Sequence, residues 1–200
     1  GENVTAYISR RGKLGNDASI DWAIGVMNEG NVVADFDSDL IGNGSHADLK
    51  AVALSSGRQV QGIDTRVTNY GCNSIGNILQ HGVILEKATL TFNGIGHIIK
   101  GAKGADAQQE SRVLMLSDQA RSDANPILLI DENDVTAGHA ASIGQVDPED
   151  MYYLMSRGLD KATAERLVVR GFLGSVIVEI PVKEVRDEMI ATIEEKLSKR

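Results

Sequence analysis

The fold is decided by the stretch Leu114-Met115-Leu116, Asn125-Pro126-Ile127-Leu128-Leu129-Ile130 and Asp134-Val135-Thr136-Ala137-Gly138-His139. Apolar runs of strand length alternate there with Asn, Asp and Gly, and they stop at a lone histidine. A helical pattern begins shortly afterwards, at Pro148. We therefore expect two parts: a mainly β domain over residues 1–146 and a small α-helical domain over residues 147–200.

The first part reads as many short strands separated by turns. Of the 21 glycines, 19 fall in the first 159 residues. Turns such as Gly42-Asn43-Gly44-Ser45 and Asn93-Gly94 use residues that tolerate positive φ. No helical pattern precedes Pro148, which excludes a doubly wound α/β sheet. A sandwich, a barrel and a β-solenoid all fit this pattern, and the scarcity of hairpin dipeptides favours the solenoid.

The tail reads as helices. Asp147 is a good N-cap, Pro148 suits the first turn and Gly158 suits the position after a helix end. We expect helices over Pro148–Arg157, Asp160–Gly171 and Pro181–Leu197. Residues 172–180 are ambiguous, because their β-branched side chains favour a strand.

Composition excludes several classes of protein. The net charge is −8, carried by 20 acidic and 12 basic residues in positions 1–159, while positions 160–200 hold 8 of each. This lack of a basic stripe argues against nucleic acid or an anionic membrane as a partner. No apolar run approaches the roughly 18–20 residues of a membrane span. The single cysteine excludes an internal disulfide and indicates a reducing, cytoplasmic location.

The start of the chain suggests that it is part of a longer protein. The first residue is Gly1 rather than Met, and Val4-Thr5-Ala6-Tyr7-Ile8 already reads as a strand. We therefore expect the β domain to be truncated at its N-terminal side.

The order of motifs resembles the SufB/SufD family of iron–sulfur cluster assembly proteins, and the SufD branch more than the SufB branch. The resemblance is carried by Asp106-Ala107-Gln108-Gln109-Glu110, by Asn77-Ile78-Leu79 with Gly82–Ala88, and by the stretch that ends at His139. It implies a right-handed parallel β-helix followed by a helical domain, with a helical turn in residues 172–180. The family's N-terminal helical part is not present in these 200 residues.

The resemblance also implies a function and partners. A SufD-like chain would be a non-catalytic scaffold subunit, with no nucleic-acid or membrane partner. The paralogue SufB would pair with the end of the β-helix near His139, and SufC, an ABC-type ATPase, would dock on the helical domain. Arg157 and Phe172 lie in the family's tail motifs; they either mark the ATPase surface or pack the tail onto the solenoid. Without SufB, we expect a homodimer across Ile127–Gly144, because open strand edges invite pairing.

His139 is the candidate site residue. By the resemblance, a cysteine stands two residues before this histidine in the family, and here Ala137 takes its place. The imidazole could ligate iron or hold a partner's ligand; alternatively, it caps the end of the solenoid. We expect no cofactor on the isolated chain, because one cysteine cannot hold a cluster, and a transient iron–sulfur cluster at the interface with SufB.

The other histidines and the cysteine are weaker candidates. His46, His81 and His97 could form a zinc site, but their neighbouring Gly and Ser residues favour solvated corners. Cys72 is expected to be a small buried core residue.

An enzyme is the alternative class. Asp35, Asp37 and Asp39 could bind calcium or line the acidic groove of a β-helical carbohydrate-active enzyme; an exposed acidic face is the simpler interpretation. Gly-x-Ser-x-Gly and a phosphate-binding loop are both missing, so we expect no nucleotide hydrolysis by this chain itself.

Overall fold

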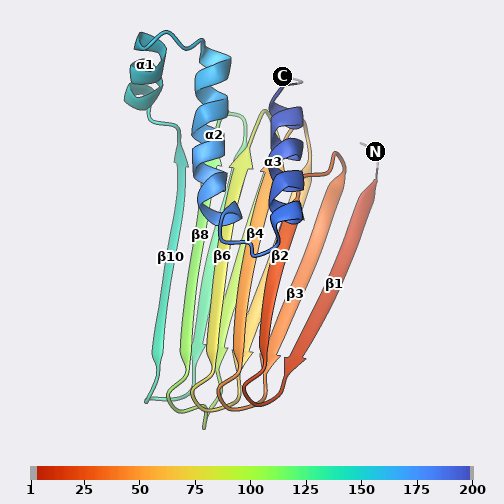
Figure 1. Ribbon diagram of the computed structural model, residues 1–200, viewed down its shortest axis with the longest axis vertical. Helices are drawn as coiled ribbons and strands as arrows, with labels where there is room; N and C mark the ends of the chain where they lie inside the picture. Colours follow the sequence, from red (N-terminus) through yellow and green to blue (C-terminus); the bar gives the residue numbers. More distant parts are fainter. Residues whose placement is uncertain (1–3, 199–200) are drawn as a thin grey trace.

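The protein is a two-sheet β-solenoid with helices on one side, as Figure 1 shows for the computed structural model. The structure describes residues 4–198, so Gly1 and the final residues of the predicted 147–200 domain lie outside the described part. One sheet contains, in order, β1 (Thr5–Leu14), β3 (Asn31–Leu40), β5 (Val60–Asn69), β7 (Thr89–Ile98) and β9 (Arg121–Ile130). The other contains β10 (Thr136–Gln145), β8 (Asp106–Met115), β6 (Ile75–Ile84), β4 (His46–Ser55) and β2 (Ser19–Val26).

Successive turns of the chain stack in register. Every pairing between neighbouring strands is parallel, and each strand pairs with the strand two places further along the chain. Val32 lies beside Gln61, and Gln61 lies beside Leu90, so these turns repeat every 29 residues. The prediction of a mainly β parallel solenoid with C-terminal helices is confirmed.

Glycine and asparagine close the corners of the solenoid. A Cβ on Gly42 would lie 2.0 Å from the backbone nitrogen of Asn16, and one on Gly71 would lie 2.0 Å from the carbonyl oxygen of Gly42. Only glycine fits at such backbone-to-backbone contacts. The Asn16 side chain accepts a hydrogen bond from the backbone N–H of Asn43, and the Asn43 side chain accepts one from Cys72. These stacked corners explain the Gly and Asn spacing in the sequence.

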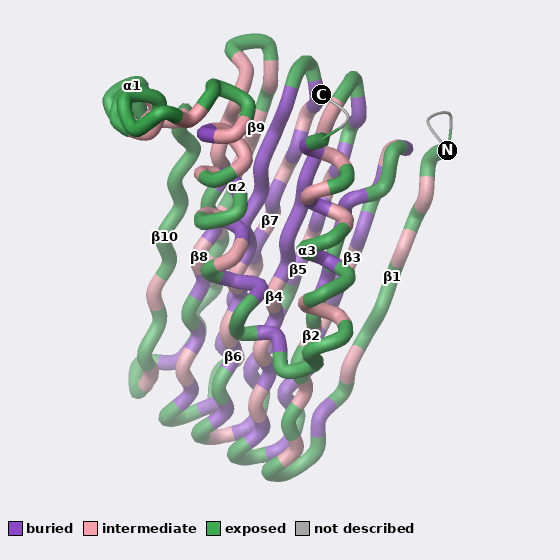
Figure 2. The backbone as a smooth tube through the Cα atoms, turned by 45° about the horizontal axis from the view of Figure 1, so that its top comes forward, coloured by how far each residue is buried: buried purple, intermediate pink, exposed green. Residues whose placement is uncertain are grey.

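The inward-facing side chains of both sheets form the main core. Trp22 and Phe36 meet across the two sheets edge to face, with ring centroids 5.5 Å apart. Burial is densest in the middle strands and falls toward β1 and β10, as Figure 2 shows. Among the described residues, packing is therefore tightest in the middle turns and looser in the first and last turns.

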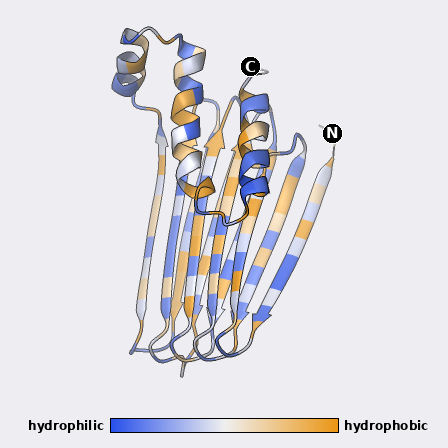
Figure 3. Ribbon diagram, in the orientation of Figure 1, coloured by the Kyte–Doolittle hydropathy of each residue, from blue (hydrophilic) through white to orange (hydrophobic). Residues whose placement is uncertain are grey.

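The helices cover the outer face of one sheet. They are α1 (Pro148–Ser156), α2 (Lys161–Ile177) and α3 (Lys183–Ser198). Helices α2 and α3 lie on the sheet that contains β4 and β6, and no described helix covers the opposite sheet (Figure 1). A second hydrophobic cluster joins Val52, Leu54 and Val83 of the sheet to Leu173 and Ile193 of the helices. Figure 3 shows α3 largely hydrophilic on its opposite side.

This packing explains an irregularity in the strands. The first half of β4 alternates between apolar and polar residues, but residues 51–55 at its end are all buried. Apart from Ser55, which hydrogen-bonds to Gln61, these residues are apolar because they face the solenoid core on one side and the helices on the other. Within residues 4–198, none of the three helices combines the length and apolarity that a bilayer span needs.

Two predicted helix boundaries need correction. The second helix does not end at Gly171; α2 continues to Ile177 because Leu173, Val176 and Ile177 are buried against the sheet. The last helix begins at Lys183 rather than Pro181. Gly158 has a φ of +93° and follows α1 as predicted. The division into domains over 1–146 and 147–200 stays a prediction.

Candidate functional site at the end of the solenoid

The last turn of the solenoid is open. Strands β9 and β10 are the final members of their sheets, so neither has a further neighbour among residues 4–198. Ile130 and Ile143 lie in register with the core residues Ile98 and Val113 and face inward, yet each is 40% exposed. An apolar face and two rows of free backbone groups are therefore available for pairing.

His139 lies on the inward-facing side of this open turn. It is in register with Gln109, which is in register in turn with the core residue Ile78. His139 therefore continues an interior row of side chains, but it is exposed because no turn covers it. Ala137, two residues earlier, faces the same way.

The histidine ring has no polar partner within residues 4–198. Among the described residues, none makes a hydrogen bond or ion pair with the His139 imidazole, which speaks against a capping role within this chain. Both ring nitrogens are available to bind a metal ion or a partner's group.

The interior beneath His139 is polar, which the sequence reasoning missed. Ser111 Oγ donates to Gln80 Oε1 at 2.7 Å, and Gln80 Nε2 donates to Thr65 Oγ1 at 3.1 Å. Gln109 Nε2 donates to the Ile127 carbonyl at 2.9 Å. The alternation of inward and outward residues along a strand could have revealed this polar interior, because Gln109 and Ser111 occupy inward positions in β8.

A carboxylate ties the open turn to the turn before it. Glu132, between β9 and β10, accepts hydrogen bonds from the backbone N–H of Asn133 at 2.8 Å and of Gly101 at 3.0 Å. These two bonds hold the pKa of Glu132 below its ordinary value. The corner that precedes β10 is therefore fixed while the strand itself is open on one side.

The two predicted tail residues lie apart from His139 and differ in their surroundings. Arg157 caps α1, and its guanidinium carbon is 5.1 Å from the centre of the Tyr153 ring. Phe172, on α2, stacks on the His81 ring at 4.9 Å and packs against the second hydrophobic cluster.

The remaining histidines lie on separate strands, each beside its own carboxylate. His46 Nε2 is 3.1 Å from Asp48, and His97 Nε2 is 3.0 Å from Asp131. For His81 the corner prediction is wrong. Its side chain is buried beneath α2, with Nε2 3.2 Å from Glu110 and Nδ1 3.2 Å from the Phe172 carbonyl. The three histidines form no common zinc site among the described residues.

Cys72 also departs from its prediction. It lies at a partly exposed corner between β5 and β6, and its thiol is 3.4 Å from the Gly101 carbonyl. The corner position arises because the preceding Gly71 makes the close contact described above, which places Cys72 outside the core.

The predicted acidic cluster lies on the outer face of β3. Asp39 is buried beside Arg11, whose Nη2 lies 2.8 Å away. Burial raises the pKa of Asp37, as does the charge of Asp35, while Arg66 and Arg11 oppose the rise. No three or more carboxylate, histidine or cysteine side chains in residues 4–198 are arranged to hold a metal ion. The acidic residues thus form part of a mixed-charge sheet face, which gives no support to a calcium site or a sugar-binding groove.

Comparison with known proteins identifies the family. The family described as SUF system FeS cluster assembly, SufBD core domain, matches residues 1–172. The chain belongs to the SufB/SufD family. It is SufD-like, being 51% identical over 195 residues to the iron–sulfur cluster assembly protein SufD of Bacillus subtilis. That match covers 97% of this chain and 45% of the Bacillus protein.

More distant members of the SufB/SufD family match as well. An iron–sulfur cluster assembly SufBD family protein of Mycobacterium tuberculosis is 33% identical over 208 residues, covering 98% of this chain and 51% of that protein. A SufBD family protein of Mycobacterium leprae is 30% identical over 183 residues, covering 90% of this chain and 21% of that protein. The chain thus spans about half the length of the first two of these relatives.

Proposed function

We propose that this chain is the non-catalytic scaffold subunit of a cytoplasmic iron–sulfur cluster assembly complex. The observation that carries the proposal is the open end of the solenoid, where unpaired strands and uncovered apolar residues surround His139. A surface of this kind suits a partner that is itself a β-solenoid, because two edge strands can continue one another's sheets. The partner would be a SufB-like paralogue.

His139 would face the nascent cluster at this interface. The cluster would be cargo rather than a resident cofactor of this chain. The only cysteine in the sequence, Cys72, lies at a corner of an earlier turn and not on the strand that carries His139. A neutral imidazole offers one lone pair to iron, and a complete cluster site needs further ligands, which the partner would supply. The isolated chain should therefore purify without a stoichiometric cluster.

The test is assembly with the SufB-like paralogue, using Ile143→Glu. Ile143 is 40% exposed at the open end, and a carboxylate there would have to be desolvated on pairing. We expect the dissociation constant measured by analytical ultracentrifugation to rise about tenfold or more. The same substitution should abolish the homodimer that we expect when the paralogue is absent.

The matched control is Tyr7→Glu, which changes a 71% exposed residue on β1 at the opposite end of the sheets. It should leave both associations unchanged. Equal effects of the two variants, or no effect of Ile143→Glu in a chain with unchanged circular dichroism, would refute pairing through this end.

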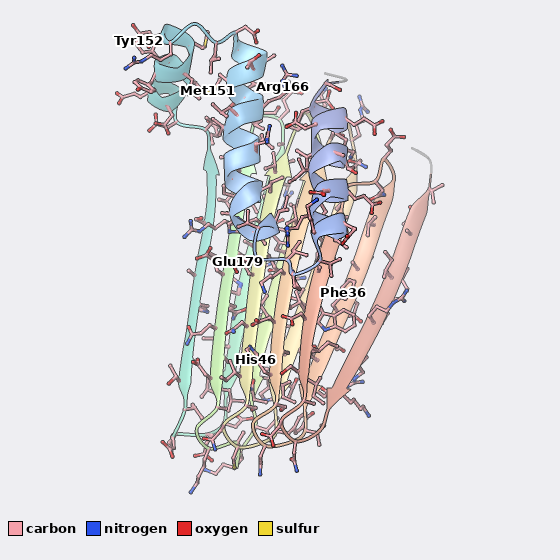
Figure 4. The ribbon with its side chains drawn as sticks, viewed as in Figure 1. Phe36, His46, Met151, Tyr152, Arg166 and Glu179 are labelled. Atoms are coloured by element: carbon pink, nitrogen blue, oxygen red, sulfur yellow. The ribbon has the colours of Figure 1, made fainter. Side chains whose placement is uncertain are left out.

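The helical part would receive an ABC-type ATPase. Helix α1 has no buried residue, and Tyr152, Tyr153 and Met155 on it are 76%, 57% and 44% exposed. Figure 4 shows Tyr152 and Met151 on this helix at a corner of the molecule. Beside it lies a hollow of about 240 Å³, lined by Met115, Met151, Met155, Lys161 and Glu165 among others. Exposed aromatic and methionine side chains next to a hollow are typical of protein-binding surfaces.

Deletion of α3 would be a poor test of this docking, because Met189, Ile193 and Leu197 belong to the second hydrophobic cluster and their loss would disturb the fold. Substitution of exposed residues on α1 avoids this problem. Tyr153→Ala combined with Arg157→Ala should weaken capture of the SufC-like ATPase about tenfold, since aromatic and arginine side chains dominate such interfaces. Phe172 contributes indirectly, by packing α2 on the sheet. Tyr7→Ala serves as the control. Full ATPase capture by the double variant would rule out α1 as the docking element.

A further inference from the structure

The ring of His81 has two nitrogens, and each faces an oxygen that acts as a hydrogen-bond acceptor. The side chain is 6% exposed and lies between β6 and α2, where it stacks on the Phe172 ring. Nε2 is 3.2 Å from Glu110 Oε1, and Nδ1 is 3.2 Å from the Phe172 carbonyl oxygen. A neutral imidazole has one N–H and one lone pair, so it satisfies only one of these acceptors. The imidazolium form has two N–H groups and satisfies both.

The neighbours of the ring do not supply the second proton in its place. Arg112 contacts both Glu110 oxygens, with Nε 3.0 Å from Oε1 and Nη2 3.2 Å from Oε2. Both oxygens of the carboxylate therefore act as acceptors, as in an ionised acid. The Ser175 hydroxyl is 2.8 Å from the Phe172 carbonyl oxygen but 3.5 Å from Nδ1 of the ring, so it donates to the carbonyl. The contacts thus require two ring N–H groups.

Two other histidines lie beside carboxylates without sharing this arrangement. His46 Nε2 is 3.1 Å from Asp48 Oδ1. His97 Nε2 is 3.0 Å from Asp131 Oδ2. In the part of the chain that the structure describes, neither ring has a hydrogen bond at Nδ1, so one N–H satisfies its polar contacts. His81 differs because both of its nitrogens are engaged.

The charges that face the buried ring come from β8. Glu110 supplies a negative charge in direct contact, while the positive charge of Arg112 opposes protonation. The Arg112 side chain is 52% exposed and paired with Glu110, so solvent weakens its effect. On β4 the in-register neighbour is the apolar Val52. Arg170 of α2 lies 3.3 Å from Glu194 of α3 and is engaged there. A cation on the ring is therefore both paired and hydrogen-bonded, the condition under which a buried charge is tolerated.

We propose that His81 is a proton-dependent latch that holds α2 on the solenoid. The protonated ring bonds Glu110 of the sheet and the Phe172 carbonyl of the helix at the same time. Loss of one proton removes one of these bonds, and the Ser175 hydroxyl is then free to turn toward Nδ1. The stabilisation is therefore present at low pH and is lost as the pH rises and the ring becomes neutral.

The first experiment is ¹⁵N NMR of the imidazole rings in the 200-residue chain at about pH 7, above the ordinary histidine pKa of about 6.5. We expect imidazolium signals for His81, with both nitrogens protonated. His139, which has no polar partner within residues 4–198, is the internal reference and should be mainly neutral. A His81 ring with one bare nitrogen at this pH would overturn the proposal, and this measurement needs no variant.

The second measurement is amide exchange in α2 between about pH 6 and about pH 8, the range in which histidines titrate. Protection factors correct for the intrinsic effect of pH on exchange. Over Lys161–Ile177 they should fall about tenfold as the pH rises, which corresponds to the loss of one charge-assisted hydrogen bond. Protection that stays constant across this range would contradict the latch.

Two variants assign the pH dependence to His81. His81→Phe keeps a ring beside Phe172 but removes both hydrogen bonds, so protection of α2 should no longer change with pH. His97→Phe makes the same substitution beside Asp131 on the other sheet and should keep the wild-type pH dependence. A folded His81→Phe chain with the wild-type pH dependence would refute the latch.

Glu110→Gln replaces His81→Phe if the latter fails to fold. This change removes the negative charge beside the ring, and the His81 signals should become those of a neutral imidazole at about pH 7. Unchanged imidazolium signals in Glu110→Gln would equally refute the latch.

The latch goes beyond the proposed function and is tested separately from it. Helix α1 contacts α2, so a loosened α2 would also affect the ATPase surface proposed on α1. NMR and exchange are measured on the chain alone, whereas capture of the ATPase needs the partner. Failure of capture by a chain with an intact latch would refute the docking alone. Normal capture by a chain whose His81 is neutral would refute the latch alone.

Discussion

At the scale of single residues, carboxylates on the solenoid surface act mainly as hydrogen-bond acceptors between turns. Asp48 on β4 accepts from Asn77 Nδ2 on β6 at 2.8 Å and contacts His46 Nε2 at 3.1 Å. Burial by itself would raise the pKa of Asp48, but the hydrogen bonds from Asn77 and His46 and the nearby Lys50 bring it below the ordinary value of 3.8. The ionised form of Asp48 therefore stabilises the stacking of two turns.

This arrangement predicts a pH-dependent effect of Asn77→Ala. Because the folded-state pKa of Asp48 is lowered, its contribution is fully present above 3.8 and is lost as the pH falls through the folded value. We expect Asn77→Ala to lower the free energy of unfolding by about 1 kcal/mol at neutral pH, a value reduced for partial exposure. In urea titrations the difference from the wild type should shrink as the pH falls below 3.8.

The control for Asn77→Ala is Asn125→Ala, which removes a bond between two neutral amides, Asn125 and Asn93. Its effect should not depend on the protonation of Asp48. A constant difference between wild type and Asn77→Ala at every pH would show that Asp48 does not respond to Asn77.

Residue-level roles were only partly predictable from the sequence. His139 was singled out mainly through the family resemblance, and its functional role stays a prediction. His81 could not, since its environment is created by α2, some 90 residues later in the chain. Cys72 was misplaced because a small apolar residue is common both in cores and in tight corners, and only the stacking of Gly71 on Gly42 shows which applies.

At the scale of elements, the helical tail is held by the outer face of one sheet rather than by contacts among the helices alone. Val52, Leu54, Val83 and Leu85 are each at most 1% exposed because the helices cover them. The continuous apolar ends of β4 and β6 were a readable signal for this cover, because a strand with one solvated face would alternate. Which helices supply the cover could not be read, since Gly171 and the β-branched residues after it made α2 look shorter than it is.

Leu173→Ala tests the attachment of α2. Leu173 is fully buried in the second hydrophobic cluster, so its truncation should lower the free energy of unfolding by about 2–5 kcal/mol. Chemical denaturation gives the value, and hydrogen exchange should show α2 opening first.

The same helix offers the matched control for Leu173→Ala. Leu167 is 50% exposed, and Leu167→Ala should change stability by less than about 0.5 kcal/mol. Similar losses in the two variants would mean that α2 is stabilised by its own helical propensity instead of by the sheet.

At the scale of the whole molecule, residues 4–198 form a stack of parallel turns that is open at its last turn and carries the helices on one of its two sheets. The strand pattern alone left a sandwich, a barrel and a solenoid open, and the parallel stacking was predicted through the family resemblance. The 29-residue repeat was not, since the corners differ in length and only the register of the strands reveals it. We propose above all that association uses the end formed by β9 and β10, where His139 belongs to an inward-facing row but is exposed.

Backbone hydrogen exchange tests that claim most directly, measured on the chain alone and in complex with the SufB-like paralogue. Free edge-strand amides exchange readily, and pairing protects them. We expect new protection in Thr136–Gln145 of β10 and in Arg121–Ile130 of β9, with none in Thr5–Leu14 of β1. Protection confined to β1 and β2, or a stable complex with unchanged exchange in β10, would contradict it.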